Sequence, residues 1–178
     1  MFVLINGAFG IGKTTLARGL VLRLPKAAIA DPEHIGFVLR RLPAPLLGLR
    51  SQPDDYQDMV LWRRLIVLQA RLVHLRTPLV IIPMAFTNRG YFEAFCAALE
   101  VTAPVLRFCL IAPLEVVRER LESRATAEGR AELTAFEITR SAECVAAHAD
   151  PAFGVMIDAR ESRTSLLERI ATHIALHM

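Results

Sequence analysis

The sequence predicts an α/β fold in which helices cover both faces of a five-stranded parallel sheet. Five short apolar runs, each typical of a buried strand, alternate along the 178 residues with segments that repeat apolar side chains at helical spacing. A glycine-rich turn joins the first apolar run to the first helical segment. No linker, internal repeat or low-complexity stretch divides the chain, so we expect a single domain over residues 1–178.

The predicted strands and helices follow one another in order. The apolar runs that predict strands are 2–6, 27–30, 79–84, 105–112 and 153–158. The patterns that predict helices are 12–24, 32–42, 54–76, 89–100, 113–125, 131–149 and 165–178. Pro32 suits the first position of the second helix, and Ser165 with Glu168 has the spacing of a capping box for the last. The segment 42–53 carries three prolines and is predicted to be a loop.

The composition is apolar, but it does not indicate a membrane span. Apolar residues make up 53% of the chain and the mean hydropathy is +0.38. The longest apolar run, 79–86, is much shorter than the roughly 18 residues that a spanning helix needs. The N-terminus has no basic region before its apolar run, so we expect no signal peptide and a cytoplasmic protein. The scattered Cys96, Cys109 and Cys144 are expected to be small buried side chains.

The charge pattern favours a small phosphate-bearing partner. The net charge is +3, and arginine supplies nearly all of the 21 basic residues. Arginine binds phosphate through two parallel hydrogen bonds more readily than lysine does. The chain has no basic tract with interleaved aromatic residues, so nucleic acid is not an expected partner.

The glycine-rich turn fits the phosphate-binding pattern G-x-x-x-x-G-K-[ST]. It consists of Gly7, Ala8, Phe9, Gly10, Ile11, Gly12, Lys13 and Thr14, and Thr15 follows it. Its glycines let the backbone N–H groups turn inward, and the helix that follows adds its positive end. We expect Lys13 to reach the β- and γ-phosphates of ATP, Thr14 to hold Mg²⁺, and Thr15 to support the α-phosphate. These features predict a P-loop NTPase fold with three layers.

Two absent motifs narrow the class of P-loop protein. The strand 79–84 and the residues that follow it contain no acid of the kind that motors and GTPases place there, and the chain has no guanine-reading NKxD. A small-molecule phosphotransferase is therefore the better expectation. Asp31 follows the second strand, where a carboxylate could take a proton from an acceptor hydroxyl. The alternative is that Asp31 only caps the helix opened by Pro32.

A third group of candidates lies on the helix after the fourth strand. Arg120 and Arg124 share one helix face in an R-L-x-x-R pattern, which is typical of the start of a kinase lid, here expected over 118–140. We expect Arg120 to lie against the adenine and Arg124 to reach the transferred phosphate. Arg140 is a further candidate, whereas Arg118 and Arg130 are expected to form surface ion pairs.

The segment 31–76 is expected to bind the acceptor. Its candidate residues are Glu33, Phe37, Arg40, Trp62 and Arg63. An aromatic ring beside an arginine could stack on a base or hold a polar ring. The alternatives are that Trp62 packs in the core and that Arg63 is solvated, and of the adjacent Arg63 and Arg64 at most one is expected to face the site.

Four segments together resemble the tunicamycin-resistance (TmrB-like) family, which belongs to the nucleotide-kinase-like P-loop proteins. They are INGAFGIGKTT (5–15), DPEHIGFVLR (31–40), DDYQDMVLWR (54–63) and VIIPM (80–84). The resemblance covers most of the chain and is strongest over 2–84. It implies a five-stranded parallel sheet of the nucleotide-kinase type with a helical lid, ATP bound at 7–15, and a nucleoside-like ligand. It also implies an acceptor pocket formed by Asp31, Glu33, Phe37, Arg40 and Arg63.

These observations predict an ATP- and Mg²⁺-dependent phosphotransferase that acts on a nucleoside-like or antibiotic acceptor. One alternative is a protein that sequesters a tunicamycin-like ligand without turnover, and another is a metabolic kinase that acts on a sugar acid or a nucleotide. The last helix, 165–178, could touch a membrane surface through its apolar face. Packing on the sheet is the more frequent role of a helix in that position.

Overall fold

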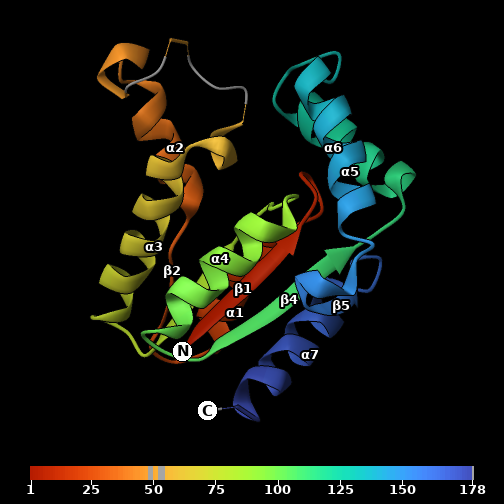
Figure 1. The fold of residues 1–178 in the computed structure, drawn as a ribbon. Coiled ribbons are helices and arrows are strands. Elements are labelled where there is room, and N and C mark those ends of the chain that lie inside the picture. Colours follow the sequence, from red (N-terminus) through yellow and green to blue (C-terminus); the bar gives the residue numbers. More distant parts are fainter. Residues whose placement is uncertain (48–49, 52–54, 178) are drawn as a thin grey trace.

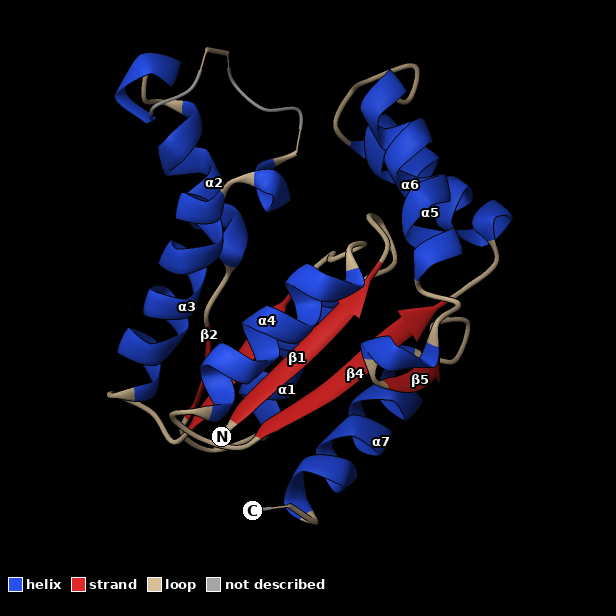
Figure 2. Ribbon diagram, in the orientation of Figure 1, coloured by secondary structure: helices blue, strands red, loops and turns tan. Residues whose placement is uncertain are grey.

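The architecture is seen in a computed structural model, which describes residues 1–47, 50–51 and 55–177. Five strands form one parallel sheet in the order β2-β3-β1-β4-β5 (Figures 1 and 2). The strands are β1 (Phe2–Gly7), β2 (Ala27–Ile29), β3 (Leu79–Pro83), β4 (Val105–Ile111) and β5 (Val155–Asp158). The predicted fold class is therefore confirmed.

Seven α-helices and three short 3₁₀ turns lie between and after the strands in the described residues. The helices are α1 (Lys13–Arg23), α2 (Pro32–Arg40), α3 (Val60–His74), α4 (Arg89–Glu100), α5 (Leu114–Ala127), α6 (Ala135–Ala147) and α7 (Arg163–Ala175). The 3₁₀ turns are η1 (Ala44–Leu47), η2 (Tyr56–Asp58) and η3 (Pro151–Phe153). None of the described helices is long and apolar enough to cross a membrane.

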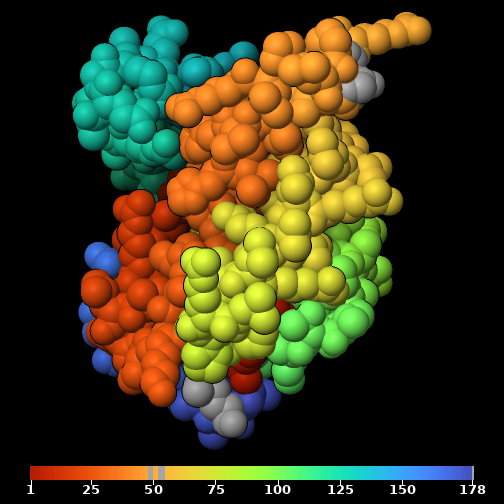
Figure 3. Space-filling view, turned by 90° about the vertical axis from the view of Figure 1, so that its left-hand side faces the viewer, coloured from red at the N-terminus to blue at the C-terminus, as the bar shows by residue number. Residues whose placement is uncertain are grey.

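The sheet is buried on both faces because its side chains alternate between two apolar clusters. Val3 and Ile5 of β1 pack with residues of α1, α5 and α7, whereas Phe2 and Leu4 pack with residues of α3 and α4. The central strands consequently read as continuous apolar runs, as expected for a parallel sheet. Figure 3 shows the side of the molecule formed by α3, with α1 and β2 on one flank and α4 on the other.

Two predictions about where helices begin are wrong. The helix expected over 54–76 begins at Val60, because Asp55 caps a separate 3₁₀ turn, η2, before it. Residue 54, where that helix was expected to begin, lies outside the described residues. The last helix begins at Arg163, and its cap is Ser162 rather than Ser165. A capping box is found instead on α6, where Thr134 and Glu137 satisfy each other's backbone N–H groups.

Helix α2, the start of α3, and helices α5 and α6 lie beyond the carboxyl ends of the strands, whereas the rest of α3 runs back beside the sheet to the ring of Phe2. On one side α2 and α3 follow β2, and on the other side α5 and α6 follow β4 (Figure 1). The loop between β1 and α1 lies at the same end of the sheet. In open parallel sheets this end is where ligands bind. The fold thus places the predicted phosphate loop, acceptor segment and lid around one region.

Candidate active site

The loop between β1 and α1 has the backbone shape of a phosphate cradle. Gly10 (φ +76°) and Gly12 (φ +104°) adopt left-handed conformations that favour glycine. A Cβ at Gly10 would also lie 2.7 Å from the side chain of Leu121. Gly12 caps α1 and provides no side-chain hydrogen bond to its first turn. The N–H groups of that turn are therefore free to bind an anion.

Lys13 has the surroundings of a lysine that binds an anion. Its half-buried ammonium donates a hydrogen bond to the carbonyl oxygen of Ala8 at 2.7 Å and lies 5.5 Å from the ring centre of Phe9. Desolvation lowers the pKa of Lys13 to about 8, against the weaker attraction of nearby acidic groups that include Glu33 and Asp31. A bound phosphate would supply the missing negative charge and raise this pKa. These residues fit a nucleotide phosphate group and, through the Thr14 hydroxyl, its magnesium ion.

A single pocket of about 520 Å³ joins the P-loop to both predicted flanking segments. From the P-loop it is lined by Phe9, Lys13 and Thr14. The acceptor side contributes Glu33, Phe37, Arg40, Tyr56, Gln57 and Trp62. The lid contributes Arg124, Glu128, Arg130, Phe136 and Glu137. The volume suits a small molecule, and the walls combine aromatic rings with a few charged groups, as ligand pockets generally do.

Helix α2 and the start of α3 form the acceptor wall. The exposed Phe37 and Arg40 lie on α2, and the Arg40 guanidinium lies 5.1 Å from the ring centre of Tyr56. Trp62 is only 6% exposed and meets the ring of Phe86 edge-on at 6.3 Å. Trp62 therefore packs in the core, as the alternative predicted, and it also lines the pocket, so its contact with an acceptor stays a prediction.

Asp31 and Arg63 do not line this pocket. Asp31 caps α2, because one of its carboxylate oxygens accepts a hydrogen bond from the N–H of Glu33 at 3.0 Å. The Arg63 side chain donates to the carbonyl oxygen of Gln57 and lies 3.9 Å from the ring centre of Tyr91, in a different groove. Glu33 is consequently the carboxylate of α2 that lines the pocket, and Asp31 stands at its edge.

Arg120 and Arg124 have different surroundings. Arg120 donates to the carbonyl oxygens of Ile11, at 3.1 Å, and Ala159, at 2.8 Å. It thereby braces the P-loop against the loop that follows β5. Arg124 lines the pocket with 60% of its side chain exposed, and its Nε lies 2.8 Å from Glu128. Arg124 thus lines the same pocket as Lys13 and Thr14, and its exposed ion pair with Glu128 can be exchanged for a contact with a bound phosphate.

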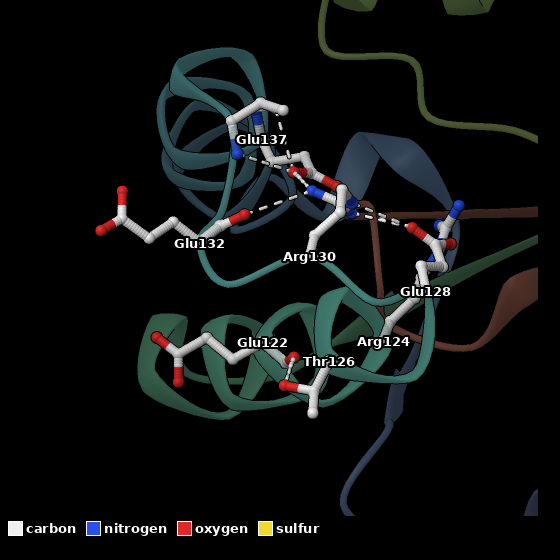
Figure 4. Close-up of polar contacts among 8 residues, drawn as sticks. Glu122, Arg124, Thr126, Glu128, Arg130, Glu132 and Glu137 are labelled. Atoms are coloured by element: carbon white, nitrogen blue, oxygen red, sulfur yellow. Dashed lines mark hydrogen bonds and ion pairs between the residues drawn. The ribbon is translucent and has the colours of Figure 1, made fainter.

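Arg130 also lines the pocket, although the sequence pattern favoured a surface ion pair for it. Its guanidinium binds both carboxylate oxygens of Glu137, at 2.9 and 3.0 Å, and also reaches Glu128 (Figure 4). Hydrogen bonds from Arg130, and then from the backbone of Thr134, lower the pKa of Glu137 to about 2. Glu128 is shared between Arg124 and Arg130, so the two arginines are held close together. The expected ion pairs exist, but they line the pocket.

Arg140 links the lid to the acceptor segment and does not line the main pocket. It forms ion pairs with Asp55, next to η2, and with Glu143 at 2.8 Å. Its side chain is only 12% exposed and lines a neighbouring cleft with Thr87 and Asn88. The geometry therefore indicates a positioning role between α6 and the acceptor side. Among the described residues, no group of three or more His, Cys, Asp or Glu side chains could hold a metal ion.

The P-loop geometry agrees with a match to a known protein family. The family model described as an AAA domain matches residues 2–144. The chain belongs to this family. A search of curated proteins found no significant match.

Solved structures place this AAA-family chain among small P-loop proteins. It is similar to the tunicamycin resistance protein of Deinococcus radiodurans, with 26% identity, a TM-score of 0.74, and coverage of 97% of this chain and 94% of that one. It also matches a gluconokinase from Sinorhizobium meliloti 1021 (14% identity, TM-score 0.64, coverage 98% and 95%). A shikimate kinase from Acinetobacter baumannii in complex with shikimate matches at 16% identity and TM-score 0.60, with coverage of 99% and 93%. The latter two support the fold alone, and the resemblance to tunicamycin-resistance proteins is confirmed.

Sequence reasoning missed a buried polar network beneath the site. His148, at the end of α6, is 1% exposed, and its Nε2 lies 2.7 Å from the carbonyl oxygen of Phe86. Asn6, at the end of β1, donates to the same carbonyl and accepts from the N–H of Phe86 at 2.8 Å. Burial lowers the pKa of His148 to about 4. The one signal in the sequence was Asn6, a lone amide at the end of an apolar strand.

Proposed function

We propose that this AAA-family protein is an ATP-dependent phosphotransferase that acts on a hydroxyl group of a small, partly apolar acceptor in the cytoplasm. The observation that carries the proposal is the pocket of about 520 Å³, which the phosphate loop, the acceptor wall and the lid arginines line together. Phosphoryl transfer needs mainly positioning and electrostatic stabilisation, and these are what such an arrangement can provide.

Each part of the chain has a distinct task in this proposal. The P-loop N–H groups and Lys13 hold the β- and γ-phosphates, and Arg124 with Arg130 stabilises charge on the transferred group. When bound, ATP supplies the phosphoryl group, and Mg²⁺ at Thr14 neutralises part of its charge. The acceptor hydroxyl oxygen forms the new bond to phosphorus as the bond to ADP breaks. Its proton passes to a carboxylate, for which Asp31 and Glu33 are the candidates.

A binding function without turnover is the second candidate. It is favoured by the position of Asp31, whose carboxylate caps α2 and does not line the pocket. In this case the acceptor would bind between the acceptor wall and the lid, and the bound ATP would only stabilise the closed pocket. The similarity to a tunicamycin resistance protein fits either function.

Asp31→Asn and Glu33→Gln provide the test, with ADP formation and ATP affinity measured on the same preparations. Asparagine preserves the helix cap, so Asp31→Asn removes the charge without disturbing α2. We expect one of these variants to abolish acceptor-dependent ADP formation while ATP binding stays within a few-fold. Unchanged turnover in both variants would remove these carboxylates from the mechanism. Lys13→Ala should abolish ATP binding and serves as the control for the P-loop.

A further inference from the structure

The outward face of α3, with the residue that follows the helix, carries a row of five leucines, four of which are exposed. Their spacings are four, three, four and three residues, and they are Leu61, Leu65, Leu68, Leu72 and Leu75. Leu65 is half-buried. The exposed fraction of the other side chains is 42% for Leu61, 51% for Leu68, 53% for Leu72 and 82% for Leu75. The opposite face of α3 already packs in the core through Trp62, Ile66 and Ala70. Single exposed leucines are ordinary, whereas a continuous row of them marks an interaction surface.

The leucine row stands between two grooves and therefore forms a ridge, which we call the α3 ridge (residues 61–75). A groove of about 880 Å³ separates it from the edge strand β2, and Leu68, Leu72 and Leu75 line that groove. A second groove of about 380 Å³ separates it from α4, and Leu68 lines that groove as well. Figure 3 shows α3 in the middle of this side of the molecule. An exposed apolar ridge of this kind can insert among lipid acyl chains.

The polar residues around the ridge are basic. The sequence from 60 to 76 contains four arginines and no aspartate or glutamate. Arg64 and Arg76 are exposed beside the leucines, and the exposed Lys26 lies at the edge of the larger groove. Among the described residues that line the two grooves, none is acidic. Over the whole sequence, residues 1–78 carry eleven basic and five acidic residues, whereas 79–178 carry ten and thirteen.

We propose that the α3 ridge docks on a membrane surface that contains anionic lipids. The leucines would enter the boundary between head groups and acyl chains, while Arg64, Arg76 and Lys26 remain at the lipid phosphates. A second copy of this chain is a poorer partner, because pairing two such ridges would bring like charges together. The charge complementarity therefore favours anionic lipid.

The last helix packs on the sheet, which is the role that the sequence favoured for it over membrane contact. The apolar side of α7 packs on the sheet through Leu166, Leu167, Ile170 and Ile174, all of them buried. Only its end leaves a large apolar side chain exposed, at Leu176. Leu176 thus provides a matched control for the ridge.

Flotation with vesicles tests the proposal. Vesicles of phosphatidylcholine alone are compared with vesicles of phosphatidylcholine and phosphatidylglycerol, at low and high salt, for the full chain and for Leu72→Glu and Leu176→Glu. We expect binding to the anionic vesicles that weakens with salt. Leu72→Glu should weaken it by more than about tenfold and Leu176→Glu by less than about twofold. A second variant, Arg64→Gln with Arg76→Gln, changes only exposed charges and should weaken binding without affecting folding.

Three results would overturn the proposal. The first is failure of the unmodified protein to float with anionic vesicles. The second is equal binding by Leu72→Glu and the unmodified protein. The third, measured by light scattering without vesicles, is a dimer that Leu72→Glu dissociates, which would assign the ridge to a second copy. Far-UV circular dichroism of each variant establishes that it is folded.

Discussion

Protonation of His148 should make the fold weaken as the pH falls below 6.5. Its imidazole is 1% exposed and its pKa is lowered by burial from the ordinary 6.5 to about 4. Between these values the unfolded chain binds a proton that the folded protein does not, so stability is full above pH 6.5 and is lost as the pH falls toward 4. Linkage gives a loss of about 2 kcal/mol at pH 5 and about 3 kcal/mol at pH 4.

Urea denaturation at pH 7 and pH 5 measures this loss, and His148→Gln isolates it. Glutamine retains an N–H donor for the carbonyl oxygen of Phe86, and it does not titrate. The difference in free energy of unfolding between the two pH values should be about 2 kcal/mol smaller in the variant. Acid-sensitive carboxylates contribute equally to both proteins and cancel. The same pH dependence in both proteins would refute the assignment of a neutral buried imidazole to His148.

Three further predictions concern the P-loop and the pocket. Arg130→Ala should lower the turnover number about 100-fold, because it removes a cation from the pocket, whereas the control Arg118→Ala should leave turnover unchanged; equal turnover in both would place Arg130 outside the site. Gly10→Ala should destabilise the fold by about 1–2 kcal/mol in thermal melts, because its φ is positive and the new Cβ would meet Leu121; an unchanged melting temperature would contradict that loop geometry. Trp62 is the single tryptophan and lines the pocket, so its fluorescence should change when an acceptor binds. Phe37→Ala should reduce the affinity for the acceptor, so at the same acceptor concentration this variant should show no change in fluorescence.

The fold could be predicted from the sequence because its signals are local. Alternation between apolar strands and amphipathic helices is enough to indicate a parallel sheet, and the run from Gly7 to Thr14 needs no distant residue to be recognised. Some helix ends were harder to predict. Ser165 and Glu168 have the correct spacing for a cap, but Ser162 lies nearer the point where the chain turns into α7.

The site was less predictable because it depends on which side chains the fold brings together. Arg130 has the sequence surroundings of a surface arginine, and only the turn between α5 and α6 brings it beside Arg124. Arg63 lies one helical step from the pocket-lining Trp62, and that step turns it toward Tyr91. The His148 network joins residues 142 positions apart, which no local pattern could indicate.

The central claim, that the pocket binds Mg²⁺·ATP and transfers phosphate to an acceptor, is most directly tested by one combined assay. Thermal stability is measured with Mg²⁺·ATP across nucleosides, nucleotides, sugar acids and tunicamycin, with ADP release read in the same samples. A ligand at a hundred times its dissociation constant adds about 2.7 kcal/mol of stability, which is readily detected. We expect an acceptor that gives both a stability shift and ADP, each lost in Lys13→Ala. A shift from an acceptor with no ADP above background would contradict phosphate transfer and leave sequestration as the function.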